Sequence, residues 1–172
     1  APQASFTEVS AAPTGFPNRV YRRAIALVEA GDNNVYVFDV FRMAGGNVRT
    51  YCFHGPPHDG FDTSMEMTPT GDEHFDVGPI GRNLDNNILQ PAAAATGDDF
   101  WANWQRKDDD LRLRVDWLGQ AGRRYISADC GKTDLPPVKF LVAEDEGEDG
   151  ASEFVSVWQP YVDEPFIDRI ER

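Results

Sequence analysis

The clearest pattern along the chain lies in residues 111–117, LRLRVDW, where apolar and polar side chains alternate strictly. The apolar positions are Leu111, Leu113, Val115 and Trp117, and the polar positions are Arg112, Arg114 and Asp116. Successive side chains of a β-strand point to opposite faces of its sheet, so this segment would bury one face and leave the other in water. The pattern predicts a strand of an antiparallel sheet that is solvated on one side.

A second pattern surrounds a Gly-Gly pair in residues 34–55, NVYVFDVFRMAGGNVRTYCFHG. Gly45 and Gly46 can adopt the positive φ that tight turns require. The runs on either side are rich in Val, Phe and Tyr, which favour strands. Residues 20–29 precede another turn-rich segment, AGDNN. We therefore expect a meander of strands over residues 20–29, 34–43 and 48–54.

The rest of the chain contains short strand patterns separated by turn formers. Further strands are expected over residues 100–107, 111–117, 123–129, 138–143, 153–161 and 166–170. Residues 55–99 are expected to form a long irregular loop region, with no more than a helical turn at 92–95, and residues 1–18 an irregular N-terminal arm or linker. Without a long amphipathic helix, this organisation predicts an all-β fold, an antiparallel β-sandwich of about ten short strands over residues 19–172.

Composition narrows the classes of function. The 172 residues are enough for one domain with a sizeable core. The formal net charge of −13 argues against a nucleic-acid partner, because phosphate binding requires a cationic surface. No apolar run approaches the ~20 residues of a membrane span. The nucleophile elbow, the Walker loop and the dinucleotide fingerprint are all absent from the sequence.

The histidines are the first candidates for catalysis or metal binding. They are His54, His58 and His74. A Pro-Pro pair separates the first two, so they cannot share a helical face as zinc ligands. Zinc ligation on loops, together with Asp39 or Asp76, is one interpretation. The other is that His54 is a half-buried residue at a strand end while the other two are solvated. His54 is the single, weak candidate for a catalytic residue.

Asp39 lies inside an otherwise apolar strand. An unpaired carboxylate there would cost several kcal/mol, so it needs a partner. We expect a structural ion pair between Asp39 and Arg22, Arg23 or Arg42.

The two cysteines, Cys52 and Cys130, allow one disulfide or two free thiols, and the sequence spacing does not decide between them.

Basic and aromatic residues also gather between residues 101 and 114. A candidate substrate-binding surface consists of Trp101, Trp104, Arg112 and Arg114, because aromatic rings stack on sugars and arginines bind carboxylates or sulfates. The alternative is that residues 108–110 neutralise the arginines and that the tryptophans belong to the core.

The order of several landmarks carries a family resemblance. Tyr21-Arg22-Arg23 leads into IALVEA, NVYVFDVFRMAGGNVRTYCFHG follows, FWANW precedes LRLRVDW, and SEFVSVWQPYVDEPFI comes last. This order resembles the later part of the C-terminal β-sandwich of heparinase II/III-like polysaccharide lyases, over residues 19–170.

The resemblance implies a function that belongs to a larger parent protein. Such lyases carry much of their active site on an α/α-toroid and cleave uronic-acid-containing glycans by β-elimination, with Tyr and His as acid and base. This chain would then be a piece of the sandwich, truncated at both ends relative to its parent, with the main catalytic residues elsewhere. The His-rich zinc-binding segments of such proteins are not in this sequence, so no cofactor is expected in this chain.

The expected partners are the toroid domain of the same parent and, through the parent, an acidic polysaccharide. The expected location is the periplasm or the exterior of the cell. The alternative function is a non-catalytic carbohydrate-binding or structural β-sandwich module.

Overall fold

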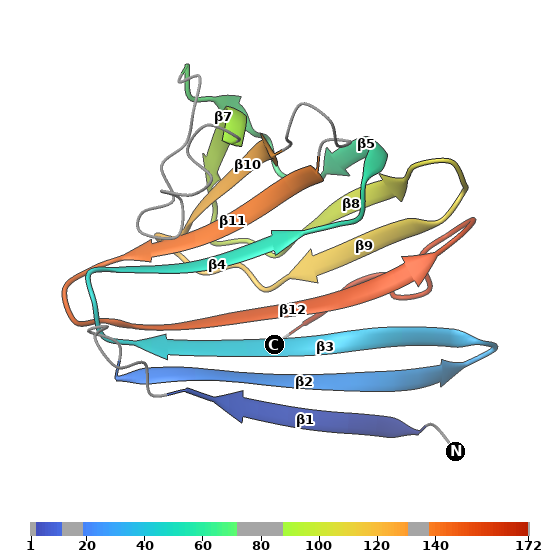
Figure 1. Ribbon diagram of the computed structural model, residues 1–172, viewed down its shortest axis with the longest axis horizontal. Helices are drawn as coiled ribbons and strands as arrows, with labels where there is room; N and C mark the ends of the chain where they lie inside the picture. The colour runs from blue at the N-terminus through green and yellow to red at the C-terminus, as the bar shows by residue number, and fades with distance from the viewer. Residues whose placement is uncertain (1–2, 12–18, 72–87, 131–137, 172) are drawn as a thin grey trace.

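The alternating apolar positions fold into two antiparallel sheets that face one another (Figure 1). The computed structural model describes residues 3–11, 19–71, 88–130 and 138–171, and these ranges contain no helix. The larger sheet has the strand order β1 (Ala4–Ser10), β2 (Val20–Gly31), β3 (Asn34–Ala44), β12 (Ala151–Tyr161), β9 (Arg112–Trp117), β8 (Phe100–Arg106) and β5 (His58–Thr63). The smaller sheet has the order β4 (Val48–His54), β11 (Val138–Glu146), β10 (Arg124–Cys130), β7 (Ile88–Ala95) and β6 (Thr68–Pro69). The predicted antiparallel β-sandwich is confirmed.

Aromatic side chains fill the space between the sheets. Trp104, Trp117 and Phe154 of the larger sheet are fully buried. From the smaller sheet, the ring of Tyr51 lies 5.7 Å from that of Phe154, and the ring of Phe53 lies 5.3 Å from that of Trp104, measured between centroids. Tilted aromatic pairs at such distances add to the free energy gained from their burial. The core therefore depends on β4 lying over β12 and β8.

Two buried arginines tie one end of the two sheets together. Arg49 of β4 donates from Nε to Ser152 Oγ of β12 at 2.8 Å. Arg123 donates to both carboxylate oxygens of Asp145 at 2.9 and 2.8 Å, and to the carbonyl oxygen of Glu153 at 2.9 Å. Burial opposes ionisation of Asp145, but the hydrogen bonds from Arg123 and Ser152 outweigh it and lower the pKa of this carboxyl group.

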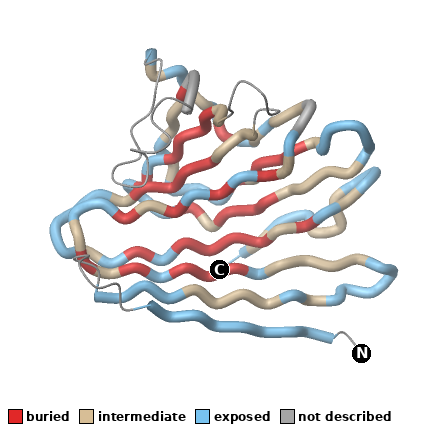
Figure 2. The backbone as a smooth tube through the Cα atoms, viewed as in Figure 1, coloured by how far each residue is buried: buried red, intermediate tan, exposed pale blue. Residues whose placement is uncertain are grey.

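The larger sheet extends beyond the smaller one. We call β1, β2 and residues 34–38 of β3 the uncovered wing, because the smaller sheet does not lie over them (Figure 1). Figure 2 shows that β1 is exposed along its whole length, whereas buried positions concentrate where the two sheets overlap. Six of the exposed large apolar side chains belong to β1, β2 and β3, namely Phe6, Val9, Val20, Tyr21, Leu27 and Phe38. Val9, Tyr21 and Leu27 share the inner face, and Phe6, Val20 and Phe38 share the outer face. Groups of exposed apolar side chains are typical of interaction faces.

The outer face of β9 and β12 carries the C-terminal segment of the chain. The amide of Gln159 exchanges two hydrogen bonds with the backbone of Ile167, each 3.0 Å long, and donates a third to Asp116 Oδ2. Arg114 also donates to the carbonyl oxygen of Asp168. The strand expected at residues 166–170 is wrong, because side chains rather than a strand ladder hold this segment.

The meander expected around Gly45-Gly46 is also wrong. β3 pairs with β2 and β12, whereas β4 pairs with β11 in the other sheet. The two glycines, with φ of 94° and 73°, carry the chain from one sheet to the other. The reason is that β3 and β4 each have an apolar face, and these faces bury each other, with Phe41 5.7 Å from Tyr51 between ring centroids.

Two segments expected to be irregular form strands. Residues 4–10 of the expected arm pair with β2, and residues 58–63, 68–69 and 88–95 of the expected loop region form β5, β6 and β7. The alanines at 92–95 are extended rather than helical because β10 supplies hydrogen-bonding partners along them. The described residues thus contain twelve strands, compared with the expectation of about ten.

The connection after β4 provides a test of the packing against Trp104. A Cβ at Gly55 would lie 2.4 Å from Trp104 Cγ, whereas a Cβ at Gly60 would meet nothing closer than 3.8 Å. Gly55→Ala is expected to lower the free energy of unfolding by about 1–3 kcal/mol, because overpacking displaces a buried ring. Gly60→Ala is the matched control. Equal urea midpoints for the two variants would contradict the close approach at Gly55.

Candidate functional site

Polar side chains from β2, β3 and β4 meet on the inner face of the larger sheet, where the smaller sheet ends. Asp39 is fully buried and accepts hydrogen bonds from Arg23 Nε at 2.9 Å and Arg23 Nη2 at 3.0 Å. Its Oδ2 also accepts from the hydroxyl of Tyr51 at 2.6 Å. We call these three side chains the Arg23 cluster. The carboxylate is fully partnered, so its burial is compensated.

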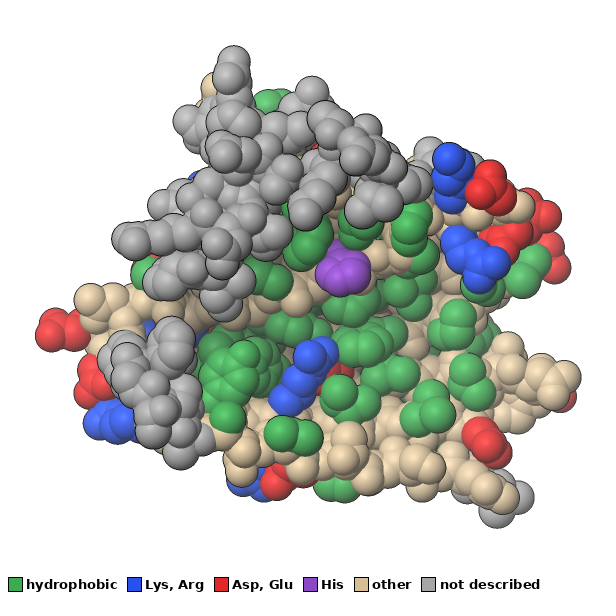
Figure 3. Space-filling view, in the orientation of Figure 1, with side chains coloured by type: hydrophobic (Ala, Val, Ile, Leu, Met, Phe, Trp, Pro, Cys, Tyr) green, Lys and Arg blue, Asp and Glu red, His purple; other side chains and the backbone are tan. Residues whose placement is uncertain are grey.

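Aromatic rings surround the guanidinium of Arg23. Its Cζ lies 5.9 Å from the ring centroid of Phe41, 5.3 Å from that of Tyr51 and 5.6 Å from that of Trp158. Each is within range of a cation–π interaction. The side chain of Arg23 is 35% exposed, so it also reaches the surface. Figure 3 views the molecule from the side of Figure 1 and shows hydrophobic side chains gathered on this face, with isolated charged side chains among them.

The protonation states of the cluster follow from its burial and charge. Burial and the nearby charge of Asp39 raise the pKa of Tyr51 far above its usual range. For Arg23, burial is the largest single effect and lowers the pKa, but the hydrogen bond to Asp39 and the charge interactions with Tyr51 and Asp39 together outweigh it, so the pKa is raised. At neutral pH the phenol is therefore a hydrogen-bond donor and the guanidinium is charged. The cluster can fix charge and geometry, but its tyrosine cannot act as a base.

Of the three arginines considered as partners of Asp39, Arg23 forms the ion pair, and Arg22 and Arg42 do not. Arg22 pairs with Glu8 at 2.5 Å, and Arg42 pairs with Glu153 at 2.7 Å. Strand alternation explains the outcome, because Arg22 and Arg42 lie opposite each other on the outer face. Only Arg23 shares the inner face with Asp39.

His54 lies on the opposite side of β4 from the cluster. Tyr51 and Phe53 point into the core, so His54 points outward, where its ring centroid lies 5.0 Å from that of Phe140. Its Nδ1 is 3.0 Å from the carbonyl oxygen of Gly55. The structure therefore does not bring His54 and Asp39 together.

The remaining metal candidates are only partly described. His74 and Asp76 lie outside the described residues, and the side chain of His58 is not described. Within the part of the chain that the structure describes, no three His, Cys, Asp or Glu side chains form a group that could hold a metal ion.

The cysteines are two free thiols rather than a disulfide. Cys52 is on β4 and Cys130 on β10, and β11 lies between these strands. Two residues separated by a whole strand are too far apart for a disulfide, which requires Cα atoms within about 7 Å.

The candidate glycan surface is divided between two faces of the larger sheet. Trp104 is fully buried and donates from Nε1 to the carbonyl oxygen of Lys139 at 3.0 Å. Trp101, Arg112 and Arg114 belong to the outer face, where the guanidinium of Arg114 lies 5.4 Å from the ring centroid of Trp101. Arg114 also forms an ion pair with Asp116 at 2.7 Å. Trp101 and Arg114 are therefore together, while Trp104 belongs to the core.

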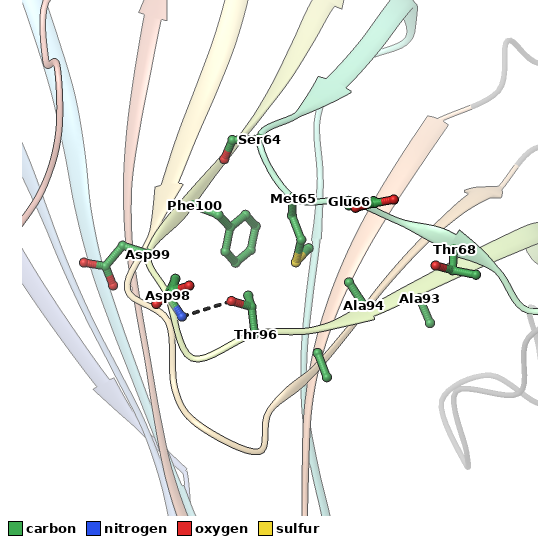
Figure 4. Close-up of a pocket in the computed structure, with 11 residues that line it drawn as sticks. Ser64, Met65, Glu66, Thr68, Ala93, Ala94, Thr96, Asp98, Asp99 and Phe100 are labelled. Atoms are coloured by element: carbon green, nitrogen blue, oxygen red, sulfur yellow. Dashed lines mark hydrogen bonds between the residues drawn. The ribbon is translucent and has the colours of Figure 1, made fainter.

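A hollow of about 860 Å³ opens where the chain crosses between the sheets at β5–β6 and β7–β8 (Figure 4). The side chains of Met65 and Phe100 point towards one another within it. Glu66, Asp98 and Asp99 are at its edge, and none of the described residues that line it is basic. The negative charge of this described lining disfavours an acidic glycan, which is the expected class of substrate.

Comparison of the chain with models of known protein families gives no match, and none of the curated proteins matches it.

Among the described residues, no helix has the length and apolar character needed to cross a membrane.

The Arg23 cluster leads to a stability prediction. Asp39→Ala is expected to lower the free energy of unfolding by about 3 kcal/mol, because it leaves the guanidinium of Arg23 and the hydroxyl of Tyr51 without their acceptor. Glu153→Ala is the matched control, since it also removes a carboxylate paired with an arginine but at an exposed site, and should cost less than about 1 kcal/mol. Urea denaturation measures both. Equal losses would contradict the role assigned to the buried pair.

Proposed function

We propose that this chain is the C-terminal β-sandwich portion of a heparinase II/III-like polysaccharide lyase. The parent would cleave an acidic, uronic-acid-containing glycan by β-elimination, with its main catalytic residues outside this chain. The observation that carries the proposal is the meeting of the landmark segments at the Arg23 cluster. Arg23 comes from Tyr21-Arg22-Arg23, Asp39 and Tyr51 from the segment at 34–55, and Trp158 from SEFVSVWQPY.

This convergence supports the resemblance because the landmarks are distant in sequence. Residues 23 and 158 are on strands separated by β3, yet the guanidinium and the indole ring are 5.6 Å apart. Any fold that buries Asp39 must supply it with donors. A shared architecture would in addition explain why those donors, and the ring of Trp158 beside them, all come from the landmark segments of β2, β4 and β12.

The chemistry of the cluster favours a structural role rather than a catalytic one. The carboxylate of Asp39 is paired with the guanidinium of Arg23, and the raised pKa of Tyr51 keeps its hydroxyl protonated. His54 is on the other side of β4. Proton abstraction beside a uronate would therefore require groups from the rest of the parent.

The uncovered wing is the surface on which the toroid would pack. On its inner face Val9, Tyr21 and Leu27 are 63%, 41% and 46% exposed. Arg23, partly exposed among them, could meet a polar group of the toroid, while the apolar side chains would lose contact with water. This arrangement would make the sandwich the base that holds the toroid in position.

The proposal predicts that the full-length parent, but not this chain alone, releases unsaturated uronides. The substrates to test are alginate, heparin and hyaluronan, and the ultraviolet absorbance of the product alkene measures release. Cleavage by this chain alone would overturn the placement of the catalytic residues elsewhere. Absence of cleavage of any uronic-acid glycan by the parent would overturn the lyase function itself.

A pair of surface variants in the parent tests the role of the wing. Leu27→Asp is expected to lower kcat/KM by about tenfold or more, because a carboxylate would be buried without a partner when the toroid packs. Val48→Asp is the control, since Val48 is 52% exposed and lies on the outer face of the smaller sheet. Equal activities of the two variants would show that the wing does not hold the toroid.

The alternative is a carbohydrate-binding module that uses the outer face of the larger sheet. It is favoured by the pairing of Trp101 with Arg114, beside Arg112. Unchanged mobility of the chain in affinity gels of alginate, heparin and hyaluronan would exclude this alternative.

A further inference from the structure

Among the described residues, no strand pairs with the outer edge of β1, so this edge presents a row of main-chain groups without a described strand as partner. β1 is the last strand of the larger sheet, and no described strand lies beside its outer edge (Figure 1). Ala11 N donates to Tyr21 O, and Glu29 N donates to Gln3 O, both at 2.9 Å. In an antiparallel pair, the main-chain groups of successive residues point alternately towards the partner strand and away from it. These two bonds show that the N–H and C=O groups of the odd-numbered residues point towards β2. The N–H and C=O groups of Ala4, Phe6, Glu8 and Ser10 therefore point outward.

This edge lacks the usual protection against pairing. Exposed edge strands are normally blocked by proline, lysine, a bulge or shortness. The sequence of β1, ASFTEVS, contains no proline or lysine, and its pairing with β2 runs over seven residues without a shift. By contrast, the other edge strand of this sheet, β5, has an irregularity between His58 and Gly60. The smaller sheet does not overhang β1, so a second strand could approach it.

The side chains beside this edge are aromatic and exposed. Phe6 lies opposite Ala26 of β2, which lies opposite Phe38 of β3, so the three form a row across the outer face of the wing. Phe6 is 69% exposed and Phe38 is 41% exposed. The row ends at the edge of the sheet with its most exposed member.

We propose that two copies of this chain pair through β1 in antiparallel orientation, centred on Phe6. In this register, Phe6 faces Phe6 of the second copy, and Ala4 faces Glu8. About six main-chain hydrogen bonds form between the outward-pointing groups. The row of Phe6, Ala26 and Phe38 then continues across the two-fold axis. Each copy uses the same edge, related by a two-fold axis, so no such edge is left for a third copy and the assembly stops at a dimer.

The charges select this register. Pairing centred on Glu8 would place two carboxylates directly opposite each other, which is destabilising. Pairing centred on Thr7 would place Phe6 beside Glu8 rather than beside another aromatic ring. Only the register centred on Phe6 joins the two aromatic side chains and separates the acids. An interface of a single strand pair is small, so the expected dissociation constant is about 1–100 μM.

Sedimentation of the full chain over a range of concentrations tests the proposal. The wild type is expected to form a dimer, and Phe6→Pro is expected to weaken it at least tenfold. Proline at this position removes an outward N–H and the aromatic ring but no hydrogen bond to β2. Val48→Pro is the matched control, because Val48 is an exposed residue on β4, the edge strand of the other sheet, and it should leave the dimer intact. Circular dichroism confirms that both variants are folded.

Three results would overturn the proposal. They are a wild type that remains monomeric at 1 mM, a series of polymers in place of a dimer, and equal weakening by the two variants. None of these results bears on uronate cleavage by the parent, so the proposed function stands or falls separately.

Disulfide cross-linking tests the register. In a chain with Cys52→Ser and Cys130→Ser, Phe6→Cys should cross-link rapidly, because directly opposite residues of a hydrogen-bonded pair have Cα atoms about 5.5 Å apart. Glu8→Cys is the control and should cross-link at least tenfold more slowly, since Glu8 faces Ala4 rather than itself. Equal rates at the two positions would contradict the register centred on Phe6.

Discussion

The buried carboxylate of Asp39 constrains the arrangement of the strands around it. A charge without water must be met by donors, and here the donors come from two other strands, Arg23 of β2 and Tyr51 of β4. β4 belongs to the smaller sheet, so the requirement links the two layers as well as neighbouring strands. Tyr51 also packs its ring against Phe41 and Phe154, so the residue that donates to Asp39 is at the same time part of the aromatic core. Packing and charge therefore select the same arrangement.

The larger sheet divides into two parts with different physical properties. Under the smaller sheet, large rings such as Trp104 and Trp117 exclude water, and arginines at one end join the layers. In the uncovered wing, apolar side chains face solvent on both sides, with Leu27 on the inner face and Phe38 on the outer. Strands with apolar side chains on both faces are typical of sheets that are covered by other structure on both faces. The Arg23 cluster lies at the boundary between the two parts, where it links β2 of the wing to β3 and to β4 of the smaller sheet.

The sequence was sufficient for the class of fold but not for the assignment of strands to sheets. Alternation in residues 111–117 predicts a strand that is buried on one face and solvated on the other. The sandwich is confirmed, but the polar face of this strand is not solvated, because Gln159 and the C-terminal segment cover it and Asp116 is buried. It does not report which strand lies beside which, so β3 and β4 were assigned to one sheet although their apolar faces oppose each other. At the candidate site, the need of Asp39 for an arginine follows from its apolar neighbours. The choice of Arg23 depends on which face each arginine occupies, and this requires the register. The local sequence pattern does not predict strands such as β7, because their hydrogen-bonding partners come from β10, which is distant in sequence.

The position of β12 has a consequence for how the chain reaches this structure. β12 lies between β3 and β9, in the middle of the larger sheet, yet it follows all the other described strands in the sequence and is synthesised after them. Until it emerges from the ribosome, the hairpin of β2 and β3 cannot join the hairpin of β8 and β9. Assembly must therefore wait for contacts between residues more than a hundred positions apart, such as Arg42 with Glu153. Such non-local closure slows folding, and a nascent chain would keep the two halves of the larger sheet apart until β12 pairs with both β3 and β9.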